Sequence, residues 1–143
     1  MTLKSFYFAL GDDGSVEPFS TFNKLNTLSI HYCKVTNAQV LCISSFTLVN
    51  LTIYCYSYYL SYKLSAPSLC NFAFTGSPNR KLYGSHLSCV KHLYIDANMV
   101  SSGKTEKDSL VLLNWLLEFA NMTSLTISYS TLQVLRLHFY FWF

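Results

Sequence analysis

Short clusters of apolar residues return along the chain with the same internal spacing. The clearest cluster fits the pattern L-x-x-L-x-L-x-x-N/C at every fixed position, with Leu25, Leu28, Ile30 and Cys33. Side chains two positions apart in a strand lie on the same face. Each cluster therefore predicts a short strand with one buried face. Weaker copies occur at Leu3/Phe6/Phe8, Leu48/Leu51/Ile53, Leu69/Phe72/Phe74, Val90/Leu93/Ile95 and Met122/Leu125/Ile127.

The clusters recur at nearly regular intervals of 22, 23, 21, 21 and 32 residues between their middle positions. A leucine-rich repeat is roughly 20 to 29 residues long and contributes one strand to a continuous parallel sheet. The spacing predicts an α/β fold, an incomplete right-handed leucine-rich-repeat solenoid of about six repeats over residues 1–130. The segments 35–43, 56–67, 76–86 and 97–110 are expected as connections. The middle residues, expected to be buried and aligned in neighbouring parallel strands, are Phe6, Leu28, Leu51, Phe72, Leu93 and Leu125.

The longest interval contains a helical pattern. Asp108 or Ser109 can cap the start of a helix, because a short polar side chain accepts a hydrogen bond from a free N–H group of the first turn. We expect one helix, ending near Asn121 and packed behind the strands, with Trp115 and Phe119 flanking its apolar face. The apolar face is formed by Leu112, Leu113, Leu116, Leu117 and Ala120.

The final segment, 131–143, is an atypical aromatic tail. Residues 131–137 could form one more short turn of the repeat, but 138–143 contains five aromatic residues and no turn or capping chemistry. The end of a solenoid needs a polar cap, and uncovered apolar surface promotes association. We therefore predict self-association or aggregation of the isolated chain.

Few residues carry a charge. Charged residues are 12 % of the chain, about half the usual quarter, and the basic residues are scattered. Nucleic-acid binding requires a basic patch, so we expect no nucleic-acid partner. The five cysteines form no C-x-x-C pair, which favours reduced thiols in a cytoplasmic or nuclear protein. Two short glycosylation sequons, at Asn50 and Asn121, point to secretion, but the N-terminal residues lack the apolar core of a signal peptide.

The longest uncharged stretch, 35–62, has the length needed to cross a bilayer. Polar residues such as Thr36, Asn37 and Asn50 interrupt it, and its apolar residues alternate as in a strand. We interpret this stretch as part of the repeat structure, with a membrane-anchored protein as an alternative.

One motif suggests nucleotide chemistry. Gly103-Lys104-Thr105 matches the end of a phosphate-binding loop, but Asn98 stands where that loop requires glycine. The seven carboxylates do not converge, and the chain has no G-x-S-x-G motif. We expect no catalytic residue, no cofactor and no enzyme, with a nucleotide-binding enzyme as an alternative.

Histidines and cysteines offer a zinc site on paper only. His31 and Cys33 lie three repeats from Cys89 and His92, which separates the pairs by roughly 14 Å at about 4.8 Å per strand. Zinc bonds are about 2.0 to 2.3 Å long, so we expect no metal site. Cys33 occupies the N/C position of its repeat, where a small side chain is expected to bond the neighbouring backbone.

The outward positions of the strands form a candidate partner-binding surface. Stacked strands would bring these side chains onto one concave sheet, where tyrosine binds well at a low cost in entropy. Tyrosine is abundant here, with 11 in the chain, so its presence on this surface is also explained by composition. The candidate positions are Tyr7, His31, Tyr32, Thr52, Tyr54, Tyr94, Asp96, Ser128 and Tyr129.

An ordered series of motifs resembles the leucine-rich-repeat region of plant F-box/LRR proteins of the FBD type. The most specific motif is L-S-A-P-S-L-x-x-F-x-F-x-G, and the resemblance covers about residues 1 to 135. The matching segments are Leu25 to Cys33, Ala38 to Ser45, Leu48 to Ile53, Leu64 to Gly76, Leu112 to Leu117 and Met122 to Ser128.

In that family the repeat region selects the protein that a cullin-RING ubiquitin ligase modifies, and an F-box docks on the ligase adaptor. The resemblance implies a protein-binding role for this chain. It contains no F-box or FBD motif, so an adaptor partner is expected only if an F-box is present elsewhere. A truncated fragment without function is the remaining alternative.

Overall fold

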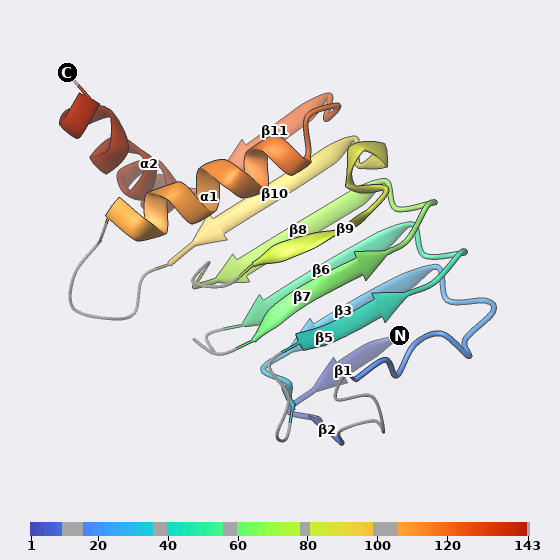
Figure 1. Ribbon diagram of the computed structural model, residues 1–143. Coiled ribbons are helices and arrows are strands. Elements are labelled where there is room, and N and C mark those ends of the chain that lie inside the picture. The colour runs from blue at the N-terminus through green and yellow to red at the C-terminus, as the bar shows by residue number, and fades with distance from the viewer. Residues whose placement is uncertain (10–15, 36–39, 56–59, 78–80, 99–105, 143) are drawn as a thin grey trace.

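The computed structural model describes residues 1–9, 16–35, 40–55, 60–77, 81–98 and 106–142, with the backbone alone for 106–108 and 136–142. Within these residues the fold is α/β, with parallel strands in three sheets and two α-helices at the C-terminal end (Figure 1). None of the described sheets is closed.

The largest sheet takes one strand from each predicted cluster, and every neighbouring pair in it is parallel. Five of the predicted middle residues are direct neighbours in its register, which confirms their predicted alignment; they are Leu28, Leu51, Phe72, Leu93 and Leu125. In order across the sheet, the strands are β1 (Thr2–Lys4), β3 (Thr27–His31), β6 (Asn50–Cys55), β8 (Asn71–Gly76), β10 (His92–Ala97) and β11 (Ser124–Ile127).

Two of the six predicted anchors are not buried. Phe6 is 52 % exposed and lies outside the sheet, because Leu3 pairs with Ile30 in its place. The backbone turns a corner at Ser5, where φ is 54°, so the first apolar cluster spans a corner that its spacing does not reveal. Leu125 is aligned as predicted but 42 % exposed, because β11 is the outermost strand.

The segments predicted as connections contain further strands. A strand needs a partner for its backbone groups, and these segments pair with one another on the other side of the molecule. They form a three-stranded parallel sheet of β5 (Val40–Ser44), β7 (Ser61–Ser65) and β9 (Leu82–Ser85). The remaining elements are the pair β2 (Tyr7–Phe8) and β4 (Lys34–Val35) and the 3-10 helix η1 (Leu87–Cys89).

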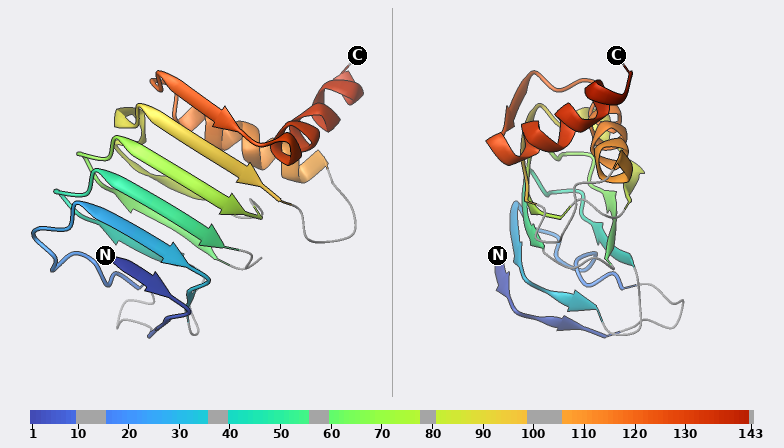
Figure 2. Two further views of the ribbon diagram at one scale, coloured as in Figure 1. Left: turned by 180° about the vertical axis from the view of Figure 1, so that it is seen from behind. Right: turned by 90° about the vertical axis from the view of Figure 1, so that its left-hand side faces the viewer.

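The core lies between the six-stranded and the three-stranded sheets (Figure 2). Leu51 and Ile53 of β6 are buried on one side of it, and Leu64 of β7 is buried on the other. The rings of Tyr62 and Phe74 meet across the layer with their centroids 6.5 Å apart. Alternating apolar residues therefore have a partner layer along most of the sheet.

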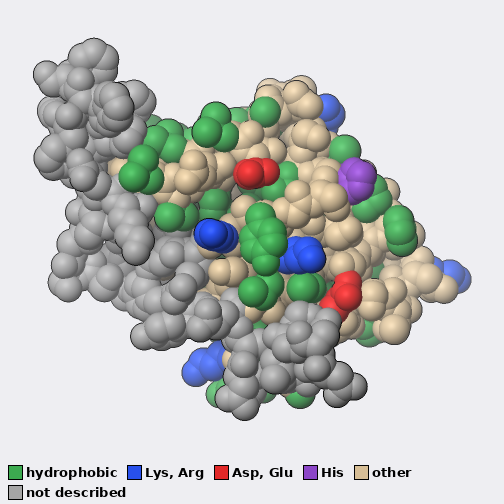
Figure 3. Space-filling model, viewed as in Figure 1, with side chains coloured by type: hydrophobic (Ala, Val, Ile, Leu, Met, Phe, Trp, Pro, Cys, Tyr) green, Lys and Arg blue, Asp and Glu red, His purple; other side chains and the backbone are tan. Residues whose placement is uncertain are grey.

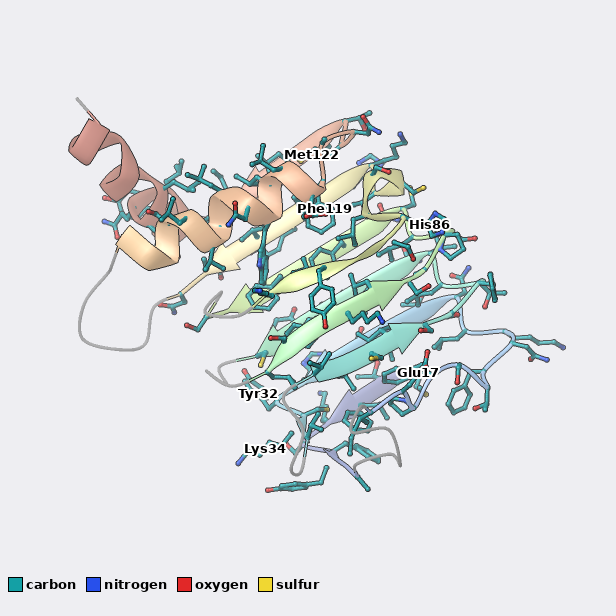
Figure 4. All side chains as sticks on the ribbon, in the orientation of Figure 1. Glu17, Tyr32, Lys34, His86, Phe119 and Met122 are labelled. Atoms are coloured by element: carbon teal, nitrogen blue, oxygen red, sulfur yellow. The ribbon has the colours of Figure 1, made fainter. Side chains whose placement is uncertain are left out.

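Helix α1 (Glu106–Glu118) takes the place of the second-layer strand in the last pass of the chain. The ring of Trp115 meets Phe74 edge to face with centroids 4.8 Å apart. Phe119, just after the helix, stacks on Phe72 at 5.4 Å and lies on the side of the helix that faces the strands (Figure 4). These aromatic contacts attach α1 to β8.

The helix was predicted, but its predicted start was wrong, and its buried face is only partly as predicted: Leu112 is buried and Leu113 and Leu116 pack against the core. It begins before Asp108 and Ser109, so neither residue caps it. Leu117 is 73 % exposed and Ala120 is also exposed, whereas the rings of Trp115 and Phe119 are buried. The helix is rotated from the predicted orientation because burying two large rings removes more apolar area from water.

Helix α2 (Tyr129–Trp142) replaces the predicted extra turn of repeat. The hydroxyl of Ser128 accepts a hydrogen bond of 3.2 Å from the N–H of Thr131, which caps the helix. Buried Thr131 in turn accepts from the N–H of Ala97 at 2.7 Å and donates to the carbonyl of Ile95 at 3.0 Å. The segment 128–131 thus contains the capping chemistry that the sequence interpretation missed.

The uncharged stretch 35–62 contains strands β5 and β6 and the start of β7. Across the described residues, no helix has both the length and the apolar character needed to cross a membrane.

Burial of Tyr62 predicts a loss of stability at high pH. Desolvation, with smaller effects of Cys55 and Cys33, raises the pKa of this phenol well above its ordinary value of 10.0. Above about pH 10 the unfolded chain releases the proton while the folded chain keeps it, so the free energy of unfolding falls by about 1.4 kcal/mol per pH unit. We expect Tyr62→Phe to lose less stability than the wild type between about pH 9 and about pH 11, measured by urea unfolding. Equal losses in the two proteins would contradict this assignment.

Candidate binding surface

One face of the six-stranded sheet points away from the core. We call it the outer face, and it consists of side chains that alternate with the buried apolar ones. None of its residues is fully buried. The register places them in three rows: Thr27, Asn50, Asn71, His92 and Ser124; Ser29, Thr52, Ala73, Tyr94 and Thr126; and His31, Tyr54, Thr75 and Asp96.

The first row is joined by a chain of side-chain hydrogen bonds. Asn71 Nδ2 donates to Asn50 Oδ1 at 2.6 Å, and Asn50 Nδ2 donates to Thr27 Oγ1 at 3.1 Å. Thr27 Oγ1 donates to Asn26 Oδ1 at 3.3 Å. Such cross-strand pairs hold neighbouring strands in register. The sequence signal is an asparagine directly before the middle apolar residue of two clusters, Asn50-Leu51 and Asn71-Phe72.

A hollow of about 270 Å³ lies on the outer face, over β6, β8, β10 and β11. It exists because the short side chain of Ala73 lies between Thr52 and Tyr94 in the second row. Amide, imidazole and hydroxyl groups surround it, among them those of Asn71 and His92. These groups can form several hydrogen bonds with an extended segment of a partner, both as donors and as acceptors. The ring of Tyr94, which is 40 % exposed, can supply apolar contact.

The third row contains a pair of stacked aromatic rings and a hydrogen-bonded carboxylate. The rings of His31 and Tyr54 stack with their centroids 4.3 Å apart and an interplanar angle of 23°. The hydroxyl of Ser130 donates to Asp96 Oδ1 at 3.1 Å. Both contacts hold side chains in fixed positions, which lowers the entropy lost when a partner binds.

The predicted surface residues divide into two groups. Five of them belong to the outer face: His31, Thr52, Tyr54, Tyr94 and Asp96. Four lie at corners or ends of the sheet: Tyr7 on β2, Tyr32 just after β3, Ser128 capping α2 and Tyr129 at the start of that helix. The tyrosines therefore do not form one continuous stripe.

Tyr32 and Lys34 mark the corner that follows β3 (Figure 4). Tyr32 has a positive φ of 54°, the same backbone conformation as Ser5 one strand away. Lys34 Nζ lies 5.8 Å from the centre of the Tyr7 ring, within the range of a cation–π contact. This corner is a small polar and aromatic cluster apart from the outer face.

The sequence motifs for metal or nucleotide binding have different outcomes. Cys33 Sγ lies 3.8 Å from the carbonyl oxygen of Leu3 and 3.6 Å from that of His31, as expected for the N/C position of a repeat. In the part of the chain with described positions, no three His, Cys, Asp or Glu residues are grouped to hold a metal ion. The segment Gly103-Lys104-Thr105 lies outside the described residues.

The opposite side of the molecule faces the viewer in Figure 3, where basic, acidic and hydrophobic side chains are scattered over the surface. A second hollow of about 700 Å³ lies there between the three-stranded sheet and α1, with Lys63, Tyr83 and Glu118 among its lining residues. The described part of this side has one short row of serines, Ser44, Ser65 and Ser85, in which Ser85 Oγ donates to Ser65 Oγ at 3.3 Å, whereas rows on the outer face cross four or five strands.

Comparisons of the chain with protein-family models, with curated proteins and with solved structures gave no match.

Proposed function

We propose that the chain is a leucine-rich-repeat module without enzymatic activity that binds a protein through the outer face of its six-stranded sheet. The observation that carries the proposal is the alignment of hydrogen-bonding and aromatic side chains in rows across that face, around a hollow of about 270 Å³. Protein interfaces place aromatic anchors beside polar groups in this way.

Three features support the leucine-rich-repeat assignment. Aligned residues recur after 23, 21 and 21 residues from Leu28 to Leu93, within the range of that repeat class. The strands are parallel and join in one sheet, and Cys33 lies against backbone carbonyl groups. The second layer is mostly strand, and a helix takes its place only in the last described pass.

The resemblance to F-box/LRR proteins of the FBD type extends this proposal to a cellular role. In that role the outer face selects the protein that a cullin-RING ubiquitin ligase modifies, and an F-box outside these residues docks on the adaptor. The low charge of the chain and its aromatic outer face suit a neutral, hydrogen-bonding partner surface more than an acidic or basic one.

A photo-crosslinking experiment tests the proposed surface. A benzophenone amino acid is introduced in place of Tyr94 on the outer face or in place of Tyr83 on the three-stranded sheet. These two tyrosines form a matched pair, because they are 40 % and 38 % exposed. We expect a discrete crosslinked protein from position 94 and none from position 83.

The identified partner then allows a measurement of affinity. Truncating an aromatic anchor at an interface costs about 2 kcal/mol, which corresponds to roughly 30-fold weaker binding. We expect Tyr94→Ala to show this loss by isothermal titration calorimetry and Tyr83→Ala to bind like the wild type. Equal losses in both variants, or a loss for Tyr83→Ala alone, would refute binding by the outer face. The ubiquitin-ligase role further requires that Tyr94→Ala reduce ubiquitination of that partner in cells.

A further inference from the structure

The six-stranded sheet ends in two strands that each have one neighbour. Among the described residues, β1 pairs only with β3, and β11 pairs only with β10. Figure 2 shows both as the outermost strands of this sheet. Helix α2, which follows β11, packs against α1 and β10. A strand edge with free N–H and C=O groups is a template for another strand.

The free groups at the two edges are complementary. Ser124 and Ser128 donate their N–H groups to β10, and alternate residues of a parallel strand face opposite neighbours. The N–H and C=O groups of Leu125 and Ile127 therefore face the open side. On β1, Met1 and Ser5 bond to β3, which leaves the groups of Thr2 and Lys4 facing outward.

The neighbouring strands inside the sheet pair through the same arrangement of backbone N–H and C=O groups. The β8–β10 pair is an example. The N–H of His92, an outer-face residue of β10, donates to the carbonyl of Cys70 just before β8, and the N–H of Asn98 donates to the carbonyl of Gly76. An outer-face residue of the later strand thus meets an apolar-side residue of the earlier one. Thr2 and Lys4 are outer-face positions, and Leu125 and Ile127 are apolar-side positions.

The chemistry of the two ends also favours contact between them. β11 has no charged residue or proline that would block an added strand. Nine of the thirteen exposed large apolar side chains among the described residues lie near the two ends of the chain, and four lie between them. Those near the ends are Met1, Phe6, Tyr7, Phe22, Leu110, Leu117, Leu125, Tyr129 and Leu132; those between are Tyr32, Phe46, Tyr83 and Tyr94.

Charge is complementary along the third row. Lys4 on β1 pairs with His31 and so extends this row to the β1 edge, and Asp96 lies on β10, one strand from the β11 edge. An added strand would place Lys4 two strand spacings from Asp96, roughly 10 Å between backbones, a distance that the long Lys4 side chain shortens.

We propose that this chain assembles head to tail, with β1 of a second copy added in parallel to the edge of β11. Leu3 of the added copy continues the row of Ile127, and its Thr2 lies beside Thr126. Because two different edges meet, the contact is heterologous and repeats from copy to copy, which produces an open series of oligomers. The proposal goes beyond partner binding and leaves the outer face free in every copy.

A pair of exposed threonines allows a direct test. Thr2 and Thr126 lie at opposite ends of one molecule, roughly 24 Å apart over five strand spacings, beyond the Debye length of about 10 Å at 0.1 M salt. Across the proposed contact they are direct neighbours. The double variant Thr2→Lys/Thr126→Lys places like charges side by side only in the assembly, whereas Thr2→Glu/Thr126→Lys places opposite charges there.

Sedimentation velocity over the micromolar range supplies the measurement, and far-UV circular dichroism verifies folding. We expect concentration-dependent oligomers for the wild type, association weakened roughly fivefold or more in the double lysine variant, and recovery in the glutamate–lysine variant. A wild type that stays monomeric would overturn the proposal, whatever the variants do. Sensitivity to Thr126→Lys alone, with Thr2→Lys and the charge swap without effect, would show a symmetric β11 contact and would also overturn it.

Discussion

Replacing Gly76 by alanine will remove a large part of the stability of the fold. Gly76 ends β8 with φ at 143°, and a Cβ atom added there would lie 1.7 Å from the carbonyl oxygen of Cys55. Residues with a Cβ atom rarely adopt this φ, and the clashing oxygen belongs to the backbone, so it cannot rotate away as a side chain could. We expect a loss of about 4 kcal/mol, a large part of the roughly 5 to 15 kcal/mol that stabilises a typical domain.

Urea unfolding measures this loss, and Thr75→Ala is the control. Thr75 is the preceding residue and lies on the outer face, so its truncation is expected to change the free energy of unfolding by only about 0.5 kcal/mol. A Gly76→Ala variant as stable as this control would mean that β8 does not approach β6 as closely as described.

Leu51→Asp will unfold the protein or leave it without cooperative melting. Leu51 is 1 % exposed and lies in the middle of the sheet between Leu28 and Phe72. An aspartate there has no partner in the apolar core, and an uncompensated buried charge costs about 3 to 5 kcal/mol. Far-UV circular dichroism and the melting curve measure the effect.

The neighbouring position provides a matched control for that substitution. Thr52 has the same two strands beside it but faces outward, so Thr52→Asp introduces the same charge next to water. We expect its melting curve to remain cooperative, within about 1 kcal/mol of the wild type. If Leu51→Asp and Thr52→Asp melted alike, the buried face of β6 would have been assigned to the wrong side.

The sequence predicted the six-stranded sheet well where clusters repeat without interruption. From Leu28 to Leu93 the intervals differ by at most two residues, and each aligned residue is buried. The first cluster misled because Leu3, Phe6 and Phe8 have the spacing of a strand while the backbone turns at Ser5. Spacing records which residues are apolar, and it does not record where a chain changes direction.

The candidate surface was predicted in part for the same reason. Alternation assigned Thr52, Tyr54 and Tyr94 to the outward side, because the parity of a strand decides its face. The hollow beside Tyr94 was not predicted, since it depends on Ala73 lying between two larger neighbours from other strands. Residues near each other across strands are about 21 positions apart in the sequence, so local patterns do not reveal them.

By itself the sequence determined the parallel strands, their faces and their register from Leu28 onward, because these follow from a local alternation that repeats. Only the tertiary structure decided what covers those strands. The predicted connections form a second sheet because the backbone N–H and C=O groups of β5, β7 and β9 hydrogen-bond to one another. Helix α1 packs with the rings of Trp115 and Phe119 against Phe74 and Phe72, because these rings bury more apolar area than the predicted leucine face of the helix would.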